Sequence, residues 1–228
     1  MSNEHRIVLV HATRVAIEPI EEAANRLWPE AEIITILEES LAVDRAKEAE
    51  LSEKMSNRII SLAKYAEKIG ADGVLFTCSA FGEAIESASK LINLPVLKPN
   101  ESMFEAALLM GDRISMIYTF EPAANGMEQE FRHSARTLNQ KAKIVSHYCA
   151  NALDAKRIGK SELHDDMIAE TASAISNSDV IMLAQFSMAS AVDRVRASTD
   201  IPVLTSPDAA ILKIKSLVEA NKRISKTC

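Results

Sequence analysis

Short apolar runs alternate with longer amphipathic stretches along the chain. The short runs are rich in Val, Ile and Leu, which is typical of strands that are covered on both faces. We predict strands over residues 7–11, 32–37, 73–77, 96–98, 113–118, 143–147, 179–184 and 203–205. Helical patterns fill the intervals, over residues 18–28, 44–69, 80–91, 102–110, 123–138, 162–176, 188–197 and 208–224. This alternation predicts an α/β fold with mainly parallel sheets.

The clearest helical pattern covers residues 44–69. Apolar side chains such as Leu51, Met55 and Ile59 recur there at spacings of three and four, as on one face of a helix. Gly70 follows directly, and a glycine is the usual residue just past a helix end.

The two halves of the sequence repeat each other at one offset. Equivalent residues are 107 positions apart at three separate anchors: Asp72 and Asp179, the Pro-Val-Leu segments 95–97 and 202–204, and Ile7 and Ile114. The alternative is a chance match, because buried strands resemble one another. Three anchors at one offset favour a true repeat.

The repeat predicts two similar lobes, each with a four-stranded mainly parallel sheet flanked by helices, related by pseudo-twofold symmetry. We expect residues 1–100 plus 206–228 in the first lobe and residues 101–205 in the second. Ligands of open α/β sheets bind outside the carboxyl ends of the strands. Both strand ends would then face one active-site cleft, with Cys78 and Gln185, again 107 positions apart, on opposite sides of a ligand.

Composition narrows the classes of function. The 228 residues are 47% hydrophobic and carry a formal net charge of -6, which argues against a disordered chain and against broad nucleic-acid binding. No apolar run is long enough to span a membrane, and the polar start does not resemble a secretion signal, so we expect a cytoplasmic protein. A glycine-rich dinucleotide fingerprint and a phosphate loop are both absent from the sequence, so we expect no NAD, ATP or similar cofactor.

The three cysteines, Cys78, Cys149 and Cys228, have neither the even number of a disulfide framework nor metal-site spacing. We interpret them as thiols in a reducing compartment. Cys149 follows a strand of the second lobe and is interpreted as structural, and Cys228 as incidental.

Cys78 is the candidate with chemistry. It lies between a buried strand and a predicted helix, where the positive end of the helix dipole favours the thiolate. The N–H groups of that helix start, with the Ser79 hydroxyl, could hold a carboxylate. A thiolate beside a bound carboxylate can remove or deliver a proton at the α-carbon. The alternative is an inert buried cysteine.

Gln185 takes the matching place in the second lobe. An amide does not act as a base near neutral pH, but it could polarise a carbonyl or steady an enolate. Its alternative is a helix-start residue bonded to nearby backbone. Ser187 could bind a carboxylate or cap the helix that follows it.

These motifs, in their order and spacing, resemble those of the aspartate/glutamate racemase superfamily, which includes hydantoin racemases, maleate isomerases and arylmalonate decarboxylases. The resemblance covers nearly the whole chain. It rests on five segments: Asp72 to Cys78; residues 94–97 with Glu101 and Ala106-Ala107; residues 113–119; Asp179 to Met188; and residues 201–204 with 208–210.

The resemblance implies a thiol mechanism with a departure. Racemases of the family use two cysteines, one on each face of the α-carbon. This chain retains the first as Cys78 but has Gln185 at the second position. It also has Ser79-Ala80 where the family's amino-acid racemases usually have Asn-Thr, which argues against a standard aspartate or glutamate substrate. The similar decarboxylases use a single cysteine, and the similar cis–trans isomerases attach a cysteine covalently to an unsaturated diacid. Relatives often form homodimers, so we expect a homodimer or higher homo-oligomer here.

Further candidates lie at the other strand ends. His11 could be an acid, a base or a structural residue, and Thr13 could contact substrate. In the second lobe Thr119 could bind carboxylate and Phe120 could shape the pocket. Phe81 and Phe186 could do the same, with core packing as the alternative. Outside the site, we place His5 in the N-terminal tail. We expect no metal site, because His164-Asp165-Asp166 is interpreted as solvated capping charge.

The leading hypothesis is a cofactor-independent enzyme that acts next to the carboxylate of a small organic acid, with Cys78 as acid, base or nucleophile. Isomerase, decarboxylase and lyase chemistry all fit. One alternative is a racemase of an amino acid or hydantoin-like acid with a non-cysteine second base, such as His11. The other is a catalytically inactive relative that binds a small acid.

Overall fold

The computed structural model describes residues 5–225 and divides the chain into two compact units. The first takes in the chain up to Pro99 and from Pro207 onward, and the second is Asn100–Ser206. Asn100 and Ser206 therefore belong to the second unit, one residue away from the expected boundary at each junction.

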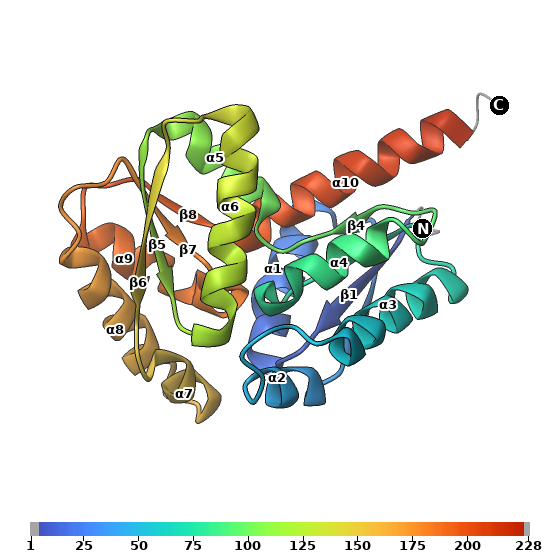
Figure 1. Cartoon of the computed structure of the whole chain (residues 1–228), viewed down its shortest axis with the longest axis horizontal. Helices are drawn as coiled ribbons and strands as arrows, with labels where there is room; N and C mark the ends of the chain where they lie inside the picture. Colours follow the sequence, from blue (N-terminus) through green and yellow to red (C-terminus); the bar gives the residue numbers. More distant parts are fainter. Residues whose placement is uncertain (1–4, 226–228) are drawn as a thin grey trace. The chain divides into compact units, whose positions relative to one another are not determined.

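The first unit contains a four-stranded parallel sheet of order β2-β1-β3-β4. Its strands are β1 (Arg6–His11), β2 (Glu32–Leu37), β3 (Gly73–Phe76) and β4 (Val96–Leu97). β1 and β3 are almost entirely buried, as the predicted apolar runs require. Its helices, shown with the strands in Figure 1, are α1 (Ile17–Leu27), α2 (Ser40–Arg45), α3 (Glu53–Lys68), α4 (Gly82–Ser89) and α10 (Ser206–Ser225), with 3-10 turns η1 (Arg14–Ala16) and η2 (Ser79–Phe81).

The predicted helix over residues 44–69 is wrong at its start, because it is two helices. α2 ends at Arg45 and α3 begins only at Glu53. The Ser52 hydroxyl caps α3 by accepting a hydrogen bond from the Met55 N–H at 3.3 Å, and this local bond starts a new helix. The predicted end is confirmed, since Gly70 adopts the left-handed φ of 82° that suits glycine.

The second unit repeats the sheet, with order β6-β5-β7-β8 and parallel pairing throughout. Its strands are β5 (Arg113–Tyr118), β6 (Lys143–Tyr148), β7 (Val180–Leu183) and β8 (Val203–Thr205). Its helices are α5 (Glu101–Met110), α6 (Ala124–Leu138), α7 (Ala152–Arg157), α8 (Ser161–Ser173) and α9 (Val192–Ser198), with 3-10 turns η3 (Glu121–Ala123) and η4 (Phe186–Ala191). The short helix α7 was not predicted, and the stretch after Gln185 starts as a 3-10 turn.

Equivalent aspartates, Asp72 and Asp179, directly precede β3 and β7, the third strands of the two units in chain order. In the first unit an Asp72 carboxylate oxygen accepts a hydrogen bond from the Arg6 backbone N–H at 2.8 Å. In the second, Asp179 accepts from the Arg113 backbone N–H at 2.8 Å, and hydrogen bonds from Arg113 lower the pKa of this carboxyl to about 2. The repeat inferred from sequence is therefore a repeat of structure, in which the same residue type makes the same bond.

The N-terminal end of the described chain is packed. His5, which we expected in a tail, is buried, and its ring centroid lies 5.5 Å from that of Trp28. Within residues 5–225, no helix is long and apolar enough to cross a membrane.

Candidate active site

Cys78 directly follows Thr77 at the carboxyl end of β3. The residue is partly exposed, whereas Ser79, Ala80 and Phe81 after it are buried in η2. The α-helix proper begins only at Gly82, because the chain first makes a 3-10 turn. The field of a helix dipole weakens beyond its first turn, so α4 acts on the thiol less than the predicted helix start would.

His11 ends β1 next to β3, and its hydrogen bond is to Thr77. The ring Nδ1 lies 2.9 Å from the Thr77 hydroxyl, which also lies 3.3 Å from the Val10 carbonyl oxygen. The ring is fully buried, and its Nε2 has no hydrogen-bond partner. Burial lowers the pKa of His11 to about 4, so the imidazole is neutral at pH 7. This environment favours the structural alternative and makes His11 a weak base.

Gln185 in the second unit is held by Thr119. Its side-chain oxygen Oε1 accepts hydrogen bonds from the Thr119 backbone N–H at 2.9 Å and from the Thr119 hydroxyl at 3.3 Å. An N–H requires an acceptor, which sets the orientation of the amide. Its Nε2 lies 3.9 Å from the Met127 sulfur, a weak acceptor. The amide of Gln185 therefore keeps donor capacity, while its oxygen is engaged.

The remaining candidates differ in exposure. Thr13 and Phe120 are half-buried and stay candidates for substrate contact. Phe186 is 1% exposed and lies among the core residues, as the packing alternative has it. Ser187 is buried inside η4 rather than at its start, so it does not cap that turn; Gln185 occupies the cap position.

Cys149 and His164, which lie outside the proposed site, are both buried. Cys149 is buried, and burial raises the pKa of its thiol. His164 and Asp165, which we interpreted as solvated, are buried and bonded to each other at 2.6 Å between Nδ1 and Oδ1. Among residues 5–225 no group of three or more His, Cys, Asp and Glu side chains is placed to hold a metal ion. Cys228 lies outside the described residues.

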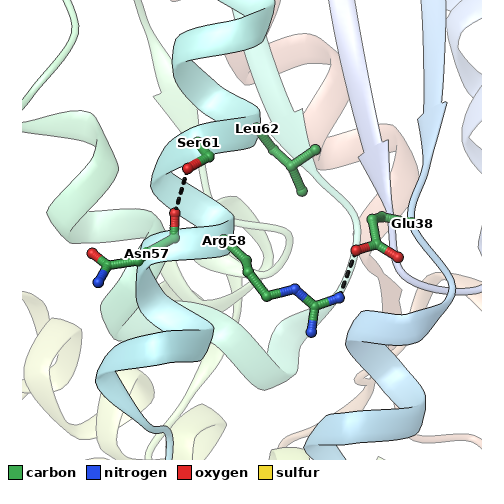
Figure 2. A pocket seen from close by; sticks show the side chains of 5 residues that line it. All are labelled: Glu38, Asn57, Arg58, Ser61 and Leu62. Atoms are coloured by element: carbon green, nitrogen blue, oxygen red, sulfur yellow. Dashed lines mark hydrogen bonds and ion pairs between the residues drawn. The ribbon is translucent and has the colours of Figure 1, made fainter.

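A pocket of about 360 Å³ lies in the first unit beside the carboxyl end of β2. Figure 2 shows Arg58 reaching from α3 toward Glu38, which follows that strand. None of the pocket-lining residues was a sequence candidate. They are Glu38, Asn57, Arg58, Ser61 and Leu62.

The predicted site residues are neighbours only in part. His11 and Cys78 end adjacent strands of one sheet, and Thr119 and Gln185 are bonded in the other. Thr77, the partner of His11, was not among the predicted residues. The contact follows from the strand register, since β1 and β3 pair with Val10 opposite Phe76, which aligns His11 with Thr77. A shared cleft between Cys78 and Gln185 stays a prediction.

Solved structures with the same fold include racemases and a decarboxylase. A glutamate racemase isoform from Bacillus anthracis has a TM-score of 0.78 at 10% identity, with 96% of this chain and 83% of that chain covered. Allantoin racemase from Pseudomonas fluorescens has a TM-score of 0.69 at 20% identity, with 94% and 91% covered. A variant of arylmalonate decarboxylase has a TM-score of 0.66 at 13% identity, with 94% and 93% covered.

No curated protein sequence matches this chain. The likeness to the solved structures confirms the predicted α/β architecture of two four-stranded parallel sheets flanked by helices. The model of one sequence family, described as Asp/Glu/hydantoin racemase, matches residues 7–211. The chain therefore belongs to the Asp/Glu/hydantoin racemase family of enzymes, as the motifs around Cys78 and Gln185 predicted.

Proposed function

We propose that this enzyme acts without a cofactor at the carbon next to the carboxylate of a small organic acid, with Cys78 as its reacting group. The observation that carries the proposal is the asymmetry between the two strand ends. One bears a partly exposed cysteine, and the equivalent position bears an amide whose oxygen is already bonded to Thr119. A thiol exchanges protons near neutral pH, whereas an amide does not.

One thiol supports three kinds of step. As a base, the Cys78 thiolate takes the α-proton and leaves an enolate, and the thiol returns a proton to that carbon. As an acid, it protonates the carbanion left when carbon dioxide departs. As a nucleophile, its sulfur adds to an activated double bond, the carbon–carbon bond rotates, and the sulfur leaves again. Each step develops negative charge on the substrate carboxylate or carbonyl oxygen.

The amide of Gln185 suits that developing charge. Its Oε1 is taken by Thr119, so the group it can offer a substrate is the NH₂ donor. A preorganised donor stabilises an oxyanion more in the transition state than in the ground state. Gln185 is thus proposed to bind and stabilise rather than to transfer a proton.

The racemase alternative needs a second base, and His11 is the histidine proposed for it. Full burial and a pKa of about 4 make His11 a poor proton acceptor at neutral pH. Cys149 is buried with a raised pKa and is equally unsuited. These environments favour one-thiol chemistry over two-base inversion.

Proton NMR in D₂O with a panel of small mono- and dicarboxylates tests the proposal. We expect deuterium at an α-carbon, or a new product, with the wild type. Cys78→Ala should lower the rate at least about 100-fold, because proton transfer by a positioned side chain contributes that much. Cys149→Ala, which removes a buried thiol, is the control and should retain the activity.

The other outcomes discriminate between the hypotheses. Retained configuration supports one-thiol chemistry, whereas inversion of a chiral acid supports the racemase alternative. Equal rates in the wild type and Cys78→Ala would remove Cys78 from the mechanism. Binding of an acid in a thermal-shift screen, without turnover, would identify an inactive small-acid-binding relative.

A further inference from the structure

The turn after Cys78 is held from the side by a buried arginine. Arg45 ends α2 and is 7% exposed, and its Nε donates to the Ala80 carbonyl oxygen at 3.3 Å. The same guanidinium donates from an NH₂ group to the Glu48 carbonyl at 2.6 Å. Burying a charged group is costly unless its donors are satisfied. Arg45 therefore links α2 to η2 at Ala80, two residues after Cys78.

α2 itself is held against α3 by a second arginine. Arg58 donates to Glu38 at 2.5 Å, before the helix starts, and to Asp44 at 2.8 Å, in its last turn. It also bonds the Ser40 hydroxyl. Figure 2 shows the Arg58 side chain extending from α3 to Glu38. A helix of six residues is too short to be stable alone, so these contacts determine where Arg45 sits.

The second unit contains a comparable hydrogen bond from a basic residue of a short helix to a 3-10 turn. Lys156 lies in α7, the short helix after β6, just as Arg45 lies in the short helix after β2. Each basic residue is eight positions past the end of its strand, which is Leu37 or Tyr148. The Lys156 ammonium donates to the Ser190 hydroxyl at 2.8 Å, within the η4 turn that follows Gln185.

Ser190 is in turn tied to the neighbouring helix. Its hydroxyl donates to Asp165 at 2.8 Å, and the same carboxylate oxygen lies 2.6 Å from the Nδ1 of buried His164. In both units, then, a basic residue of the short helix after the second strand donates a hydrogen bond to the 3-10 turn after the third strand. The contacts fall at different residues of the two turns, since Ala80 is two positions past Cys78 and Ser190 is five positions past Gln185.

We infer that Arg45 and Lys156 are matched positioning residues, which hold the turns carrying Cys78 and Gln185 in the geometry that the reaction needs. The inference rests on the proposed function in giving Cys78 and Gln185 their roles. Arg45 holds the backbone itself, through a carbonyl oxygen, whereas Lys156 holds a side-chain hydroxyl. The turn after Cys78 should therefore respond more to loss of its cation than the turn after Gln185.

The reactivity of the Cys78 thiol tests this without a substrate. The rate of its alkylation by iodoacetamide is measured across pH, with peptide mass spectrometry to separate it from Cys149 and Cys228. In Arg45→Met we expect roughly tenfold slower alkylation at pH 7, because the turn shifts when the cation bonded to Ala80 is lost. Arg14→Met, which removes an exposed ion pair with Glu39 just before α2, is the matched control and should react like the wild type.

A second variant keeps the test decisive if Arg45→Met does not fold, as judged by circular dichroism. Arg45→Lys retains the charge but replaces the planar fork, which reaches two carbonyls, with a single ammonium, and should be several-fold slower. If Arg45→Met folds and is alkylated as fast as the wild type, Arg45 is not a positioning residue. If Arg45→Met does not fold, a wild-type alkylation rate in Arg45→Lys would overturn the inference in the same way.

Lys156→Met tests the proposed role of Lys156 at the turn after Gln185, with a substrate identified by the NMR panel. We expect an unchanged Cys78 alkylation rate and a lower kcat at similar KM, with Arg157→Met on the same helix as the control. A wild-type kcat in Lys156→Met would overturn the part of the inference that concerns Gln185. Because alkylation does not depend on the substrate, failure of the positioning role is distinguishable from failure of the proposed function.

Discussion

His11 and Gln185 have their hydrogen-bonding atoms committed by single threonine neighbours. Thr77 bonds the Nδ1 of His11, and Thr119 bonds the Oε1 of Gln185. In each case one polar atom is engaged, and the other, Nε2, lacks a strong partner. The residue type sets what each side chain can do, and the threonine decides which atom is left to do it.

The pH dependence of stability should report the burial of His11. Its pKa falls from 6.5 to about 4 on folding, so the unfolded chain binds the proton more readily. The stabilisation is fully present above about pH 6.5 and is lost as the pH falls toward 4, at about 1 kcal/mol per pH unit. Urea unfolding between pH 4 and pH 7 gives the free energy of unfolding at each pH. This free energy should rise less steeply with pH for His11→Asn than for the wild type.

His133→Asn is the control for that slope, since His133 is exposed on α6. Half-buried His147 and buried His164 also have pKa values lowered by burial, so part of this pH dependence will persist in His11→Asn. An identical slope in His11→Asn and the wild type would contradict the buried, neutral state of the ring.

At the scale of elements, β3 and α10 of the first unit approach each other closely at a glycine, Gly73. A Cβ placed on Gly73, the first residue of β3, would lie 2.7 Å from a Val218 methyl and 3.2 Å from Ile214, both on α10. Gly126 in α6 has no such neighbour within 4 Å. The same substitution should therefore have opposite effects at the two positions.

We expect Gly73→Ala to lower the free energy of unfolding by about 1–3 kcal/mol, because α10 must move away from the sheet. Gly126→Ala should raise it by roughly 0.5–1 kcal/mol, because alanine restricts the unfolded chain and favours helix. Chemical denaturation measures both. Equal stability of Gly73→Ala and the wild type would mean that α10 does not pack on β3 as described.

Elements also show where local pattern and packing disagree. The strand over residues 113–118 was predicted with its observed limits, because a buried apolar run ends at polar residues on both sides. The helix over residues 44–69 was not, because an amphipathic pattern continues across the loop between α2 and α3. The Ser52 cap and the hydrogen bond from Arg58 to Asp44 of α2 separate the two helices. The second of these is a tertiary contact.

At the scale of the whole molecule, the chain enters and leaves the second unit at bonded residues. The Ser206 hydroxyl donates to the Asn100 side-chain oxygen at 2.6 Å, and both residues are fully buried. These two residues are 106 positions apart. The bond therefore closes the second unit by joining its first residue to its last.

A double-mutant cycle should measure that closure. Asn100→Ala and Ser206→Ala should each lower the free energy of unfolding by about 1–3 kcal/mol, because each leaves a buried polar partner unsatisfied. Together they should lose less than the sum, with a coupling of about 1 kcal/mol. Ser61→Ala, exposed on α3, is the control for a serine substitution. Additive losses would show that the two residues do not depend on each other.

The sequence by itself determined the two parallel sheets, the repeat and the family, because these depend on residue type and spacing along the chain. It also singled out Cys78 and Gln185, since both directly follow a predicted buried strand. The tertiary structure decided what surrounds them: the burial that keeps His11 neutral, the threonine that engages the Gln185 oxygen, and the arginine that holds the turn after Cys78. These bonds join residues 35 to 66 positions apart, and such distant partners are decided by packing rather than by local pattern.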